Sequence, residues 1–157
     1  MEIQRITSFS VDHDVLTPGF YISRADGDVT TYDLRTRKPN ARDYMSNAAM
    51  HSVEHMMATF LRNGPMAGDI IYFGPMGCQT GFYLLVRSRA PGDVFDEVKR
   101  VLAAVLDYDG PVFGASAKEC GNYRNLSLDA AKVECRGYLA VLEKRSGVDF
   151  SYPKGDA

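Results

Sequence analysis

The sequence has no tryptophan, and only three cysteines and three histidines among its 157 residues. Because an odd and sparse set of cysteines does not build a disulfide scaffold, we expect a reducing, cytoplasmic setting. No apolar stretch approaches the roughly 20 residues that a membrane-spanning helix needs, which argues against a membrane partner. The charged N-terminus has no apolar run behind it, so we expect no signal peptide.

The charges are nearly balanced, with 18 Lys and Arg against 20 Asp and Glu and a net charge of −2. Basic residues never gather into a long run, which argues against a nucleic-acid partner. A chain of this length, with 45% hydrophobic and 24% charged residues, is typical of one globular domain. We therefore expect a single domain over residues 1–157, whose function depends on a few rare residues.

Two of the histidines lie four positions apart, with a glutamate directly before the second: His51, Glu54 and His55. Residues 46–63 contain no Pro or Gly, and Gly64-Pro65 follow as a stop signal, so a helix is predicted here. Two imidazoles one helical turn apart can ligate the same metal ion. Glu54 is poorly placed as a further ligand but well placed as a general acid or base, as in His-x-x-Glu-His metal enzymes.

This predicted helix has an apolar side and a chemically functional side. The apolar arc consists of Met50, Val53, Met56, Met57, Phe60 and Leu61, and the positions left for water are Ser52, Thr59 and Asn63. The pattern predicts a central, largely buried metal-binding helix. Histidines that only form hydrogen bonds in the interior are the alternative.

A third metal ligand is needed, and Cys120 is the better of two candidates. It lies in a polar, turn-like stretch from which a thiolate can turn toward an ion, whereas Cys135 lies among apolar residues at helical spacing and is predicted to be a core residue. Two imidazoles, one thiolate and a water would form an open tetrahedral site for zinc or ferrous iron. The open position favours catalysis over a structural role.

The remaining cysteine, Cys78, lies between two strand-like segments, among Pro75, Gly77 and Gly81. These residues predict a bend or bulge where the backbone can approach a ligand closely. A thiol at such a place can act as an acid, a base or a nucleophile. An inert cysteine within the sheet is the alternative.

Together these segments resemble the S-ribosylhomocysteine lyase (LuxS) family. Five segments, from residue 8 to about residue 128, follow one another in the family's order. They are Ser8-Phe9-Ser10-Val11-Asp12-His13, Tyr32-Asp33-Leu34-Arg35 with Lys38-Pro39-Asn40, His51-Ser52-Val53-Glu54-His55, Pro75-Met76-Gly77-Cys78-Gln79-Thr80-Gly81 and Glu119-Cys120-Gly121-Asn122-Tyr123-Arg124.

The resemblance implies a carbon–sulfur lyase that cleaves S-ribosylhomocysteine to homocysteine and 4,5-dihydroxy-2,3-pentanedione, the precursor of autoinducer-2. In this family two enolisations move the carbonyl along the ribose chain, and homocysteine leaves by β-elimination. The resemblance also implies ferrous iron without redox change, no organic cofactor, and a homodimer with active sites at the subunit interface. The predicted ligands would accept zinc or cobalt as well. The products would serve quorum sensing or recycling in the methyl cycle.

By the same resemblance, Cys78 serves the first isomerisation, and Glu54 serves the later proton transfers and the elimination. The residues that would hold the substrate are Ser8, His13 and Arg35, and the metal ligands would be His51, His55 and Cys120. Tyr72 is a departure, because family members usually carry an acidic residue there, so a polar contact to the sugar is replaced or lost. From Val133 onward the chain shows helix-like patterning without a family signature.

We expect an α+β fold in which helices pack on a mainly antiparallel sheet. The predicted strands cover residues 20–23, 29–34, 69–73 and 81–86, with a turn at 25–28 between the first two. Besides the histidine helix, helices are predicted at 94 to about 108, N-capped by Asp93, and at 128 to about 145, N-capped by Ser127. Gly137, in the middle of the last helix, suggests close packing against a neighbour.

Two other functions fit parts of the pattern. A metal-dependent hydrolase could be a deformylase-like amidase that keeps Cys120 as a ligand and does not need Cys78. It could also be a peptidase with a reversed motif, which would recruit Glu134 as the third ligand. A non-catalytic metal or thiol sensor would bind the metal and use Cys78 to respond to its surroundings.

Overall fold

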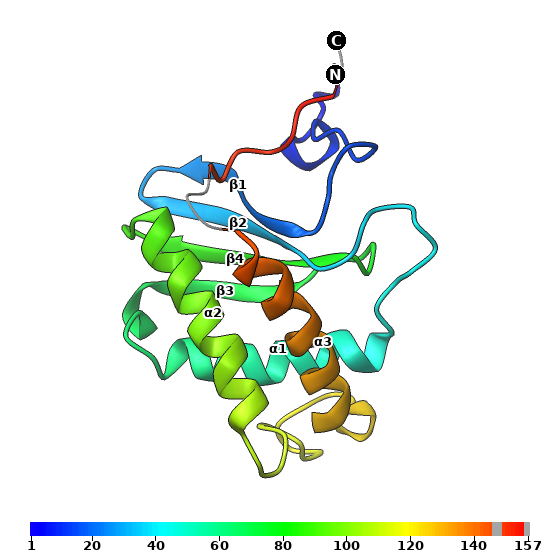
Figure 1. Cartoon of the computed structure of the whole chain (residues 1–157), viewed down its shortest axis with the longest axis vertical. Coiled ribbons are helices and arrows are strands. Elements are labelled where there is room, and N and C mark those ends of the chain that lie inside the picture. Colours follow the sequence, from blue (N-terminus) through cyan, green and yellow to red (C-terminus); the bar gives the residue numbers. More distant parts are fainter. Residues whose placement is uncertain (146–148, 156–157) are drawn as a thin grey trace.

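The computed structural model describes residues 1–145 and 149–155. It confirms the predicted α+β fold: four antiparallel strands, in the order β1-β2-β4-β3, form a sheet with three helices on one face (Figure 1). The strands are β1 (Gly19–Asp26), β2 (Val29–Arg35), β3 (Ile70–Pro75) and β4 (Gly81–Arg87). The helices are α1 (Asn47–Arg62), α2 (Pro91–Asp107) and α3 (Leu128–Glu143), with 3-10 turns η1 (Thr7–Phe9), η2 (Ala67–Asp69) and η3 (Tyr123–Asn125).

The sheet consists of two hairpins joined through the pairing of β2 with β4. Gly27, with φ +61°, closes the β1–β2 turn in a backbone conformation that glycine adopts without strain. Between β3 and β4 the Pro75–Gly81 stretch forms the predicted turn, which the Met76 N–H closes by donating to the Gly81 carbonyl at 2.9 Å. A side chain at Gly81 would lie 2.7 Å from the Leu34 carbonyl, so glycine allows β4 to approach β2 here.

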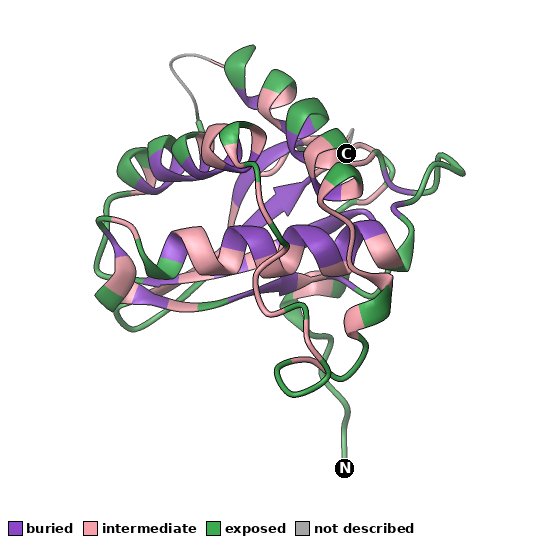
Figure 2. Ribbon diagram, turned by 90° about the horizontal axis from the view of Figure 1, so that it is seen from below, coloured by how far each residue is buried: buried purple, intermediate pink, exposed green. Residues whose placement is uncertain are grey.

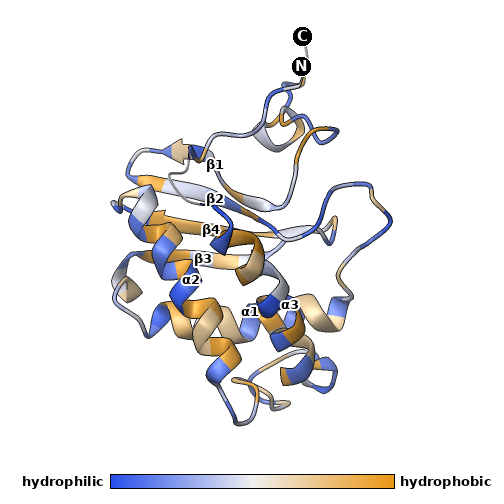
Figure 3. Ribbon diagram, in the orientation of Figure 1, coloured by the Kyte–Doolittle hydropathy of each residue, from blue (hydrophilic) through white to orange (hydrophobic). Residues whose placement is uncertain are grey.

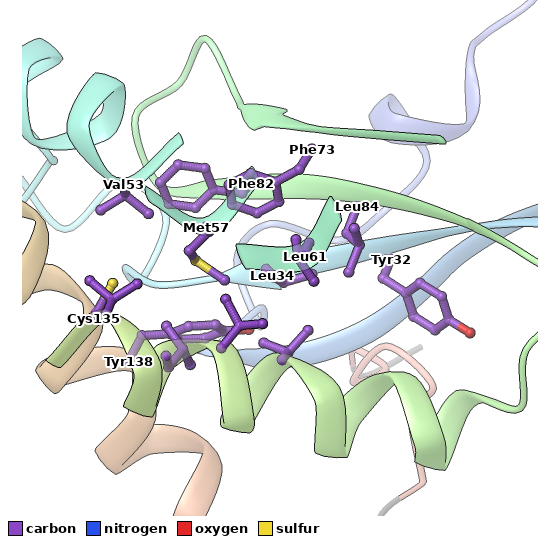
Figure 4. Close-up of a cluster of buried hydrophobic side chains, with 14 of the residues drawn as sticks. Tyr32, Leu34, Val53, Met57, Leu61, Phe73, Phe82, Leu84, Cys135 and Tyr138 are labelled. Carbon is purple, nitrogen blue, oxygen red and sulfur yellow. The ribbon is translucent and has the colours of Figure 1, made fainter. Parts of the chain in front are cut away.

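The hydrophobic core lies between the sheet and the helices (Figure 4). Strand β4 is strongly apolar (Figure 3). This suits its position, since alternate residues face the helices and most of the intervening ones are partly covered. Tyr32 and Leu34 of β2 belong to this cluster together with Met57 and Leu61 of α1, and all four are buried. Cys135 of α3 is 1% exposed in the same core, so the predicted core role of this cysteine is confirmed.

Helix α1 follows the prediction closely. The Ser46 side chain caps its N-terminus by accepting a hydrogen bond from the Ala49 N–H at 3.1 Å, and Asn63 caps its C-terminus. Buried and partly buried positions alternate along it (Figure 2). The predicted exposure of Ser52 was wrong: its Oγ donates to the Ala48 carbonyl and accepts from the Ser127 N–H at 2.8 Å. Because the start of α3 lies against α1, this position faces protein and not water.

Two further local predictions were wrong. Helix α2 begins at Pro91, three residues before the predicted start, so Asp93 lies in its first turn and Ala90 is the N-cap. Proline fits the first helical position because its fixed φ suits the helix and no N–H is left unpaired. Gly137 in α3 faces open space, with no neighbouring atom within 4 Å of where a Cβ would lie, so the expected close packing is absent there. The N-cap Ser127 is confirmed, with its Oγ 3.2 Å from the Ala130 N.

After α3, residues 149–155 run beside β1 and the N-terminal segment (Figure 1). The Phe150 carbonyl accepts a hydrogen bond from the Ile22 N–H at 2.8 Å, and the Phe150 ring packs on Phe20 and Phe95. The segment therefore covers part of the edge of β1 that does not pair with β2. No helix in the described part of the chain is long and apolar enough to cross a bilayer.

Candidate functional site

The three predicted metal ligands come together in the folded chain. Donor atoms of His51, His55 and Cys120 lie within 4.8 Å of one another, and all three residues are partly buried. Cys120 Sγ lies 3.3 Å from His51 Nε2, and the two imidazole rings stand at 89° with their centroids 4.6 Å apart. Glu134, the alternative ligand of a reversed-motif peptidase, pairs instead with Arg37 Nη2 at 2.6 Å. The described residues thus form a His-His-Cys donor set.

Hydrogen bonds to oxygen atoms use only the Nδ1 atom of each imidazole. His51 Nδ1 lies 2.5 Å from Asn125 Oδ1, and His55 Nδ1 lies 2.7 Å from the Phe113 carbonyl oxygen. The Asn125 amide is itself oriented by Asn47, whose Oδ1 accepts from its Nδ2 at 2.7 Å. Since these oxygens only accept, each Nδ1 carries a proton and each Nε2 is left for the donor set, in which Cys120 Sγ lies 3.3 Å from His51 Nε2. This is the arrangement that histidine ligands need, so the residues fit a divalent metal.

Cys120 reaches the histidines from a turn after Ser116. The Cys120 N–H donates to the Ser116 carbonyl at 3.0 Å, and the Asn122 N–H lies 3.5 Å from Cys120 Sγ. A soft sulfur beside two imidazole nitrogens is a donor set that zinc, ferrous iron and cobalt all accept.

Two cavities are lined in part by the Pro75–Gly81 stretch between β3 and β4. The first, of about 280 Å³, is lined by Asn47, Met50, His51, Glu54, Pro75 and Asn122. The second, of about 270 Å³, is lined by His13, Pro39, Asn40, Tyr44, Gly77, Cys78, Gln79 and Thr80. Glu54 thus lines a cavity together with the metal ligand His51, and Cys78 lines the other cavity.

Cys78 is exposed, and its sulfur lies in a polar environment. Cys78 Sγ is 3.0 Å from Thr80 Oγ1 and 3.9 Å from Arg35 Nη1. Arg35 is not a surface charge, because it is 2% exposed and its Nε and Nη2 donate to Asp33 at 3.1 and 2.6 Å. Burial by itself would lower the pKa of the Arg35 guanidinium. The charge and hydrogen bonds of Asp33, with a smaller contribution from Cys78, outweigh burial, so this pKa is raised. A permanent cation therefore lies beside the thiol.

The other predicted substrate contacts are only partly assembled within one chain. His13 lines the Cys78 cavity, with its Nδ1 2.9 Å from the Val11 carbonyl oxygen. Ser8 lies in η1 and lines a separate hollow that includes Thr31 and Tyr83. Tyr72 is 51% exposed on β3 and its ring lies over Gly74, where an added Cβ would clash with it. Among the described residues, Tyr72 lines neither cavity of the site.

Several residues that support the site escaped the sequence analysis. Asn125 and the Phe113 carbonyl orient the histidines, and Asp33 holds Arg35. Asp33 and Thr80 lie within segments that carry the family resemblance, so the sequence does contain a signal for these two residues. The Phe113 carbonyl has no sequence signal, because every residue carries a carbonyl and only the fold decides its direction.

The thiols should differ sharply in reactivity. Burial, and to a smaller extent Glu134, raises the pKa of Cys135 to about 12, so this thiol stays neutral and inaccessible near neutral pH. We expect iodoacetamide at pH 8 to modify the metal-free native protein at Cys78 and Cys120 but not at Cys135, as read by peptide mass spectrometry. All three should react in denaturant. Labelling of Cys135 in the native protein would contradict its placement in the core.

The contact between Gly114 and His55 provides a second test. Gly114 has φ +70°, and an added Cβ would lie 3.1 Å from His55 Nδ1. We expect Gly114→Ala to weaken metal affinity roughly 10- to 100-fold, as measured by competition with a chromophoric chelator, because it disturbs the hydrogen bond that orients this ring. Gly27→Ala is the matched control, since Gly27 has φ +61° and no neighbour within 4 Å. Gly27→Ala should therefore keep the wild-type metal affinity. An equal loss of affinity in both variants would show that backbone strain, and not the contact with His55, causes the loss.

Comparison with known proteins gives consistent matches over almost the whole chain. The family described as S-Ribosylhomocysteinase (LuxS) matches residues 6–148. A protein named S-ribosylhomocysteine lyase from Borreliella afzelii is 42% identical over 157 residues, covering 96% of this chain and 100% of its own. Proteins of the same name from Finegoldia magna and Desulfotalea psychrophila are 42% and 43% identical, covering 97% and 96% of this chain and 100% and 99% of their own.

Proposed function

Because the chain belongs to the S-ribosylhomocysteinase (LuxS) family, we propose that it is a lyase that cleaves S-ribosylhomocysteine to homocysteine and 4,5-dihydroxy-2,3-pentanedione. The observation that carries the proposal is the convergence of His51, His55 and Cys120 within 4.8 Å, beside a cavity that Glu54 lines. Relatives named S-ribosylhomocysteine lyase support the choice of substrate.

The residues His51, His55 and Cys120 would hold a divalent ion, which we propose to be ferrous iron, with zinc or cobalt as substitutes. When bound, such an ion supplies Lewis acidity to the sugar oxygens of the substrate. The hydrogen bonds of Asn125 and the Phe113 carbonyl would keep both histidines in the tautomer that ligation requires. No organic cofactor is part of the proposal.

Moving a carbonyl along the sugar requires groups that take a proton from one carbon and return it to the next. We assign the first isomerisation to Cys78, because its thiol faces a cavity and its sulfur lies 3.9 Å from the Arg35 cation. We assign the later proton transfers and the β-elimination to Glu54, which lines a cavity together with His51. Both cavities are lined in part by the Pro75–Gly81 stretch, so we propose that a single extended substrate reaches both groups.

We propose that His13, Arg35 and Ser8 hold the substrate, and that the active protein is a homodimer with sites at the subunit interface. His13 and Cys78 already share a cavity, and Arg35 lies behind it. Ser8 lines a different hollow of its own chain together with Ile6. In the same N-terminal segment the apolar side chains of Ile3, Ile6 and Phe9 are 84, 56 and 70% exposed. Apolar side chains of this kind favour burial against a second subunit.

We also propose that residues 1–157 form one catalytic domain that works in the cytoplasm, where the pentanedione product would be released as the autoinducer-2 precursor. Both quorum sensing and the methyl cycle are proposed uses of the products. Sedimentation velocity of the purified protein tests the dimer directly, and a monomer at micromolar concentration would contradict it.

The activity is tested with protein purified anaerobically and loaded with ferrous iron or cobalt. S-ribosylhomocysteine is added, and free thiol is followed with a colorimetric reagent after subtraction of the protein's own thiols. Metal-dependent, multiple-turnover thiol release is expected. Its absence from metal-replete protein would contradict the lyase, and hydrolysis of a formyl peptide by the same sample would favour the amidase instead.

A further inference from the structure

Tyr152, near the C-terminal end of the described chain, is connected to Cys78 through a row of polar side chains. Its Oη donates a hydrogen bond to Asp33 Oδ2 at 2.7 Å. Asp33 in turn accepts two hydrogen bonds from Arg35, at 3.1 Å from Nε and 2.6 Å from Nη2. Arg35 Nη1 donates to Thr80 Oγ1 at 2.8 Å and to Cys78 Sγ at 3.9 Å. A continuous set of contacts therefore leads from the C-terminal segment to the thiol.

This row lies on the face of the sheet that the helices do not cover. Strand side chains alternate between faces, and Tyr32 and Leu34 point into the helix-covered core, so Asp33 and Arg35 point the other way. Asp33 is nonetheless 0% exposed and Arg35 is 2% exposed. A buried ion pair depends strongly on each additional hydrogen bond, because water cannot replace a missing partner. The Tyr152 hydroxyl is one of these partners.

Tyr152 is held in place independently of its hydroxyl. Its ring stacks on Tyr21, with centroids 5.1 Å apart and 25° between the planes, and the preceding Phe150 is anchored to β1 through the Ile22 N–H at 2.8 Å. Burial, and then the charge of Asp33, raises the pKa of Tyr152, so the phenol keeps its proton and acts as a donor. A substitution that keeps the ring should therefore remove the donor alone.

We propose that Tyr152 is a positioning residue for Cys78: its hydroxyl orients the Asp33–Arg35 pair and so keeps the Arg35 guanidinium against the thiol. A donor on Asp33 Oδ2 also draws off part of the carboxylate's negative charge. Without it, Asp33 would cancel more of the Arg35 field at Cys78, and the thiolate would be less favoured. The inference deepens the role proposed for Cys78 and rests on that role for its catalytic meaning.

Other titratable groups also face Cys78. His13 and Tyr44 line the same cavity, and Tyr83 of β4 lies close enough to interact electrostatically with the thiol. The change Tyr152→Phe alters none of these groups. A change in the reactivity of Cys78 in this variant would therefore report on the path through Asp33 and Arg35.

The test measures alkylation of Cys78 by iodoacetamide as a function of pH in the metal-loaded protein. Peptide mass spectrometry follows Cys78 separately from the other thiols. We expect Tyr152→Phe to raise the pH midpoint of alkylation by about half a unit, which slows alkylation at pH 7 about threefold. The matched control is Tyr138→Phe, which removes another buried hydroxyl, bonded to the Gly19 carbonyl at 2.8 Å. It should leave the midpoint unchanged.

A second substitution keeps the test sensitive even if Tyr152→Phe loosens the C-terminal segment. Replacing Tyr152 with a ring-fluorinated tyrosine makes the hydroxyl a stronger donor and keeps the stacked ring. The midpoint should then fall instead of rising. A purely structural role predicts no opposite shift, so equal midpoints in the wild type and the fluorinated protein, or a rise in both substituted proteins, would overturn the proposal.

The outcome does not depend on turnover. Opposite midpoint shifts in a protein that releases no thiol from S-ribosylhomocysteine would support the positioning role and contradict the lyase. An active lyase whose Cys78 midpoint is unaffected by either Tyr152 substitution would support the lyase and contradict the positioning role.

Discussion

The change Cys78→Ala should reduce thiol release from S-ribosylhomocysteine by roughly 10²- to 10⁴-fold, the usual contribution of a general acid–base group. Glu54→Gln should have an effect of the same order, because the amide cannot accept or return a proton. Both variants should keep their full metal content by elemental analysis, since neither side chain belongs to the His-His-Cys donor set. The loss would therefore reflect chemistry and not the loss of the ion.

The controls separate the two assigned groups from general effects of substitution. Cys135→Ala removes a buried thiol of the core and Glu143→Gln removes a carboxylate at the exposed end of α3, and both should retain turnover. The two assigned groups should also differ in the step that they block. If Cys78 serves the first isomerisation, Cys78→Ala should leave the substrate unchanged, whereas Glu54→Gln should let a rearranged ketone accumulate. Turnover by Cys78→Ala near the wild-type rate would contradict its assignment and would favour the amidase or the sensor.

The change Asp33→Asn should destabilise the fold by about 3–5 kcal/mol, the usual cost of removing one partner of a buried ion pair. Asp33 is 0% exposed, and its carboxylate accepts both contacts from Arg35 as well as the Tyr152 hydroxyl. The amide cannot accept all three, so the buried guanidinium keeps its charge without a counter-ion. For a chain of this size, Tm should fall by roughly 6–20 °C.

The matched control for this prediction is Asp26→Asn, which breaks the Arg24–Asp26 pair at the end of β1. That pair has the same chemistry, with 2.5 Å between Arg24 Nη2 and Asp26 Oδ1, but both side chains are more than half exposed. Water solvates the separated charges there, so no measurable change in Tm is expected. Equal Tm values for Asp33→Asn and the wild type would mean that the Asp33–Arg35 pair contributes no net stability.

What the sequence determined by itself is local. Helix α1 and the one-turn spacing of His51 and His55 depend on residues within a few positions of one another, so their pattern is readable along the chain. The same is true of the alternating strands and of the turn that carries Cys78. The family resemblance combined such local segments, and the match over residues 6–148 confirms it.

What only the tertiary structure decided involves residues far apart in the sequence. Asn125 and the Phe113 carbonyl reach the histidines across at least 58 positions, and Tyr152 reaches Asp33 across 119. The burial of Ser52 likewise depends on where the start of α3 packs. Periodicity shows which face of an element is apolar but not which other element covers it. The partners of a buried charge or of a metal-binding imidazole are therefore set only when the sheet, the helices and the C-terminal segment pack together.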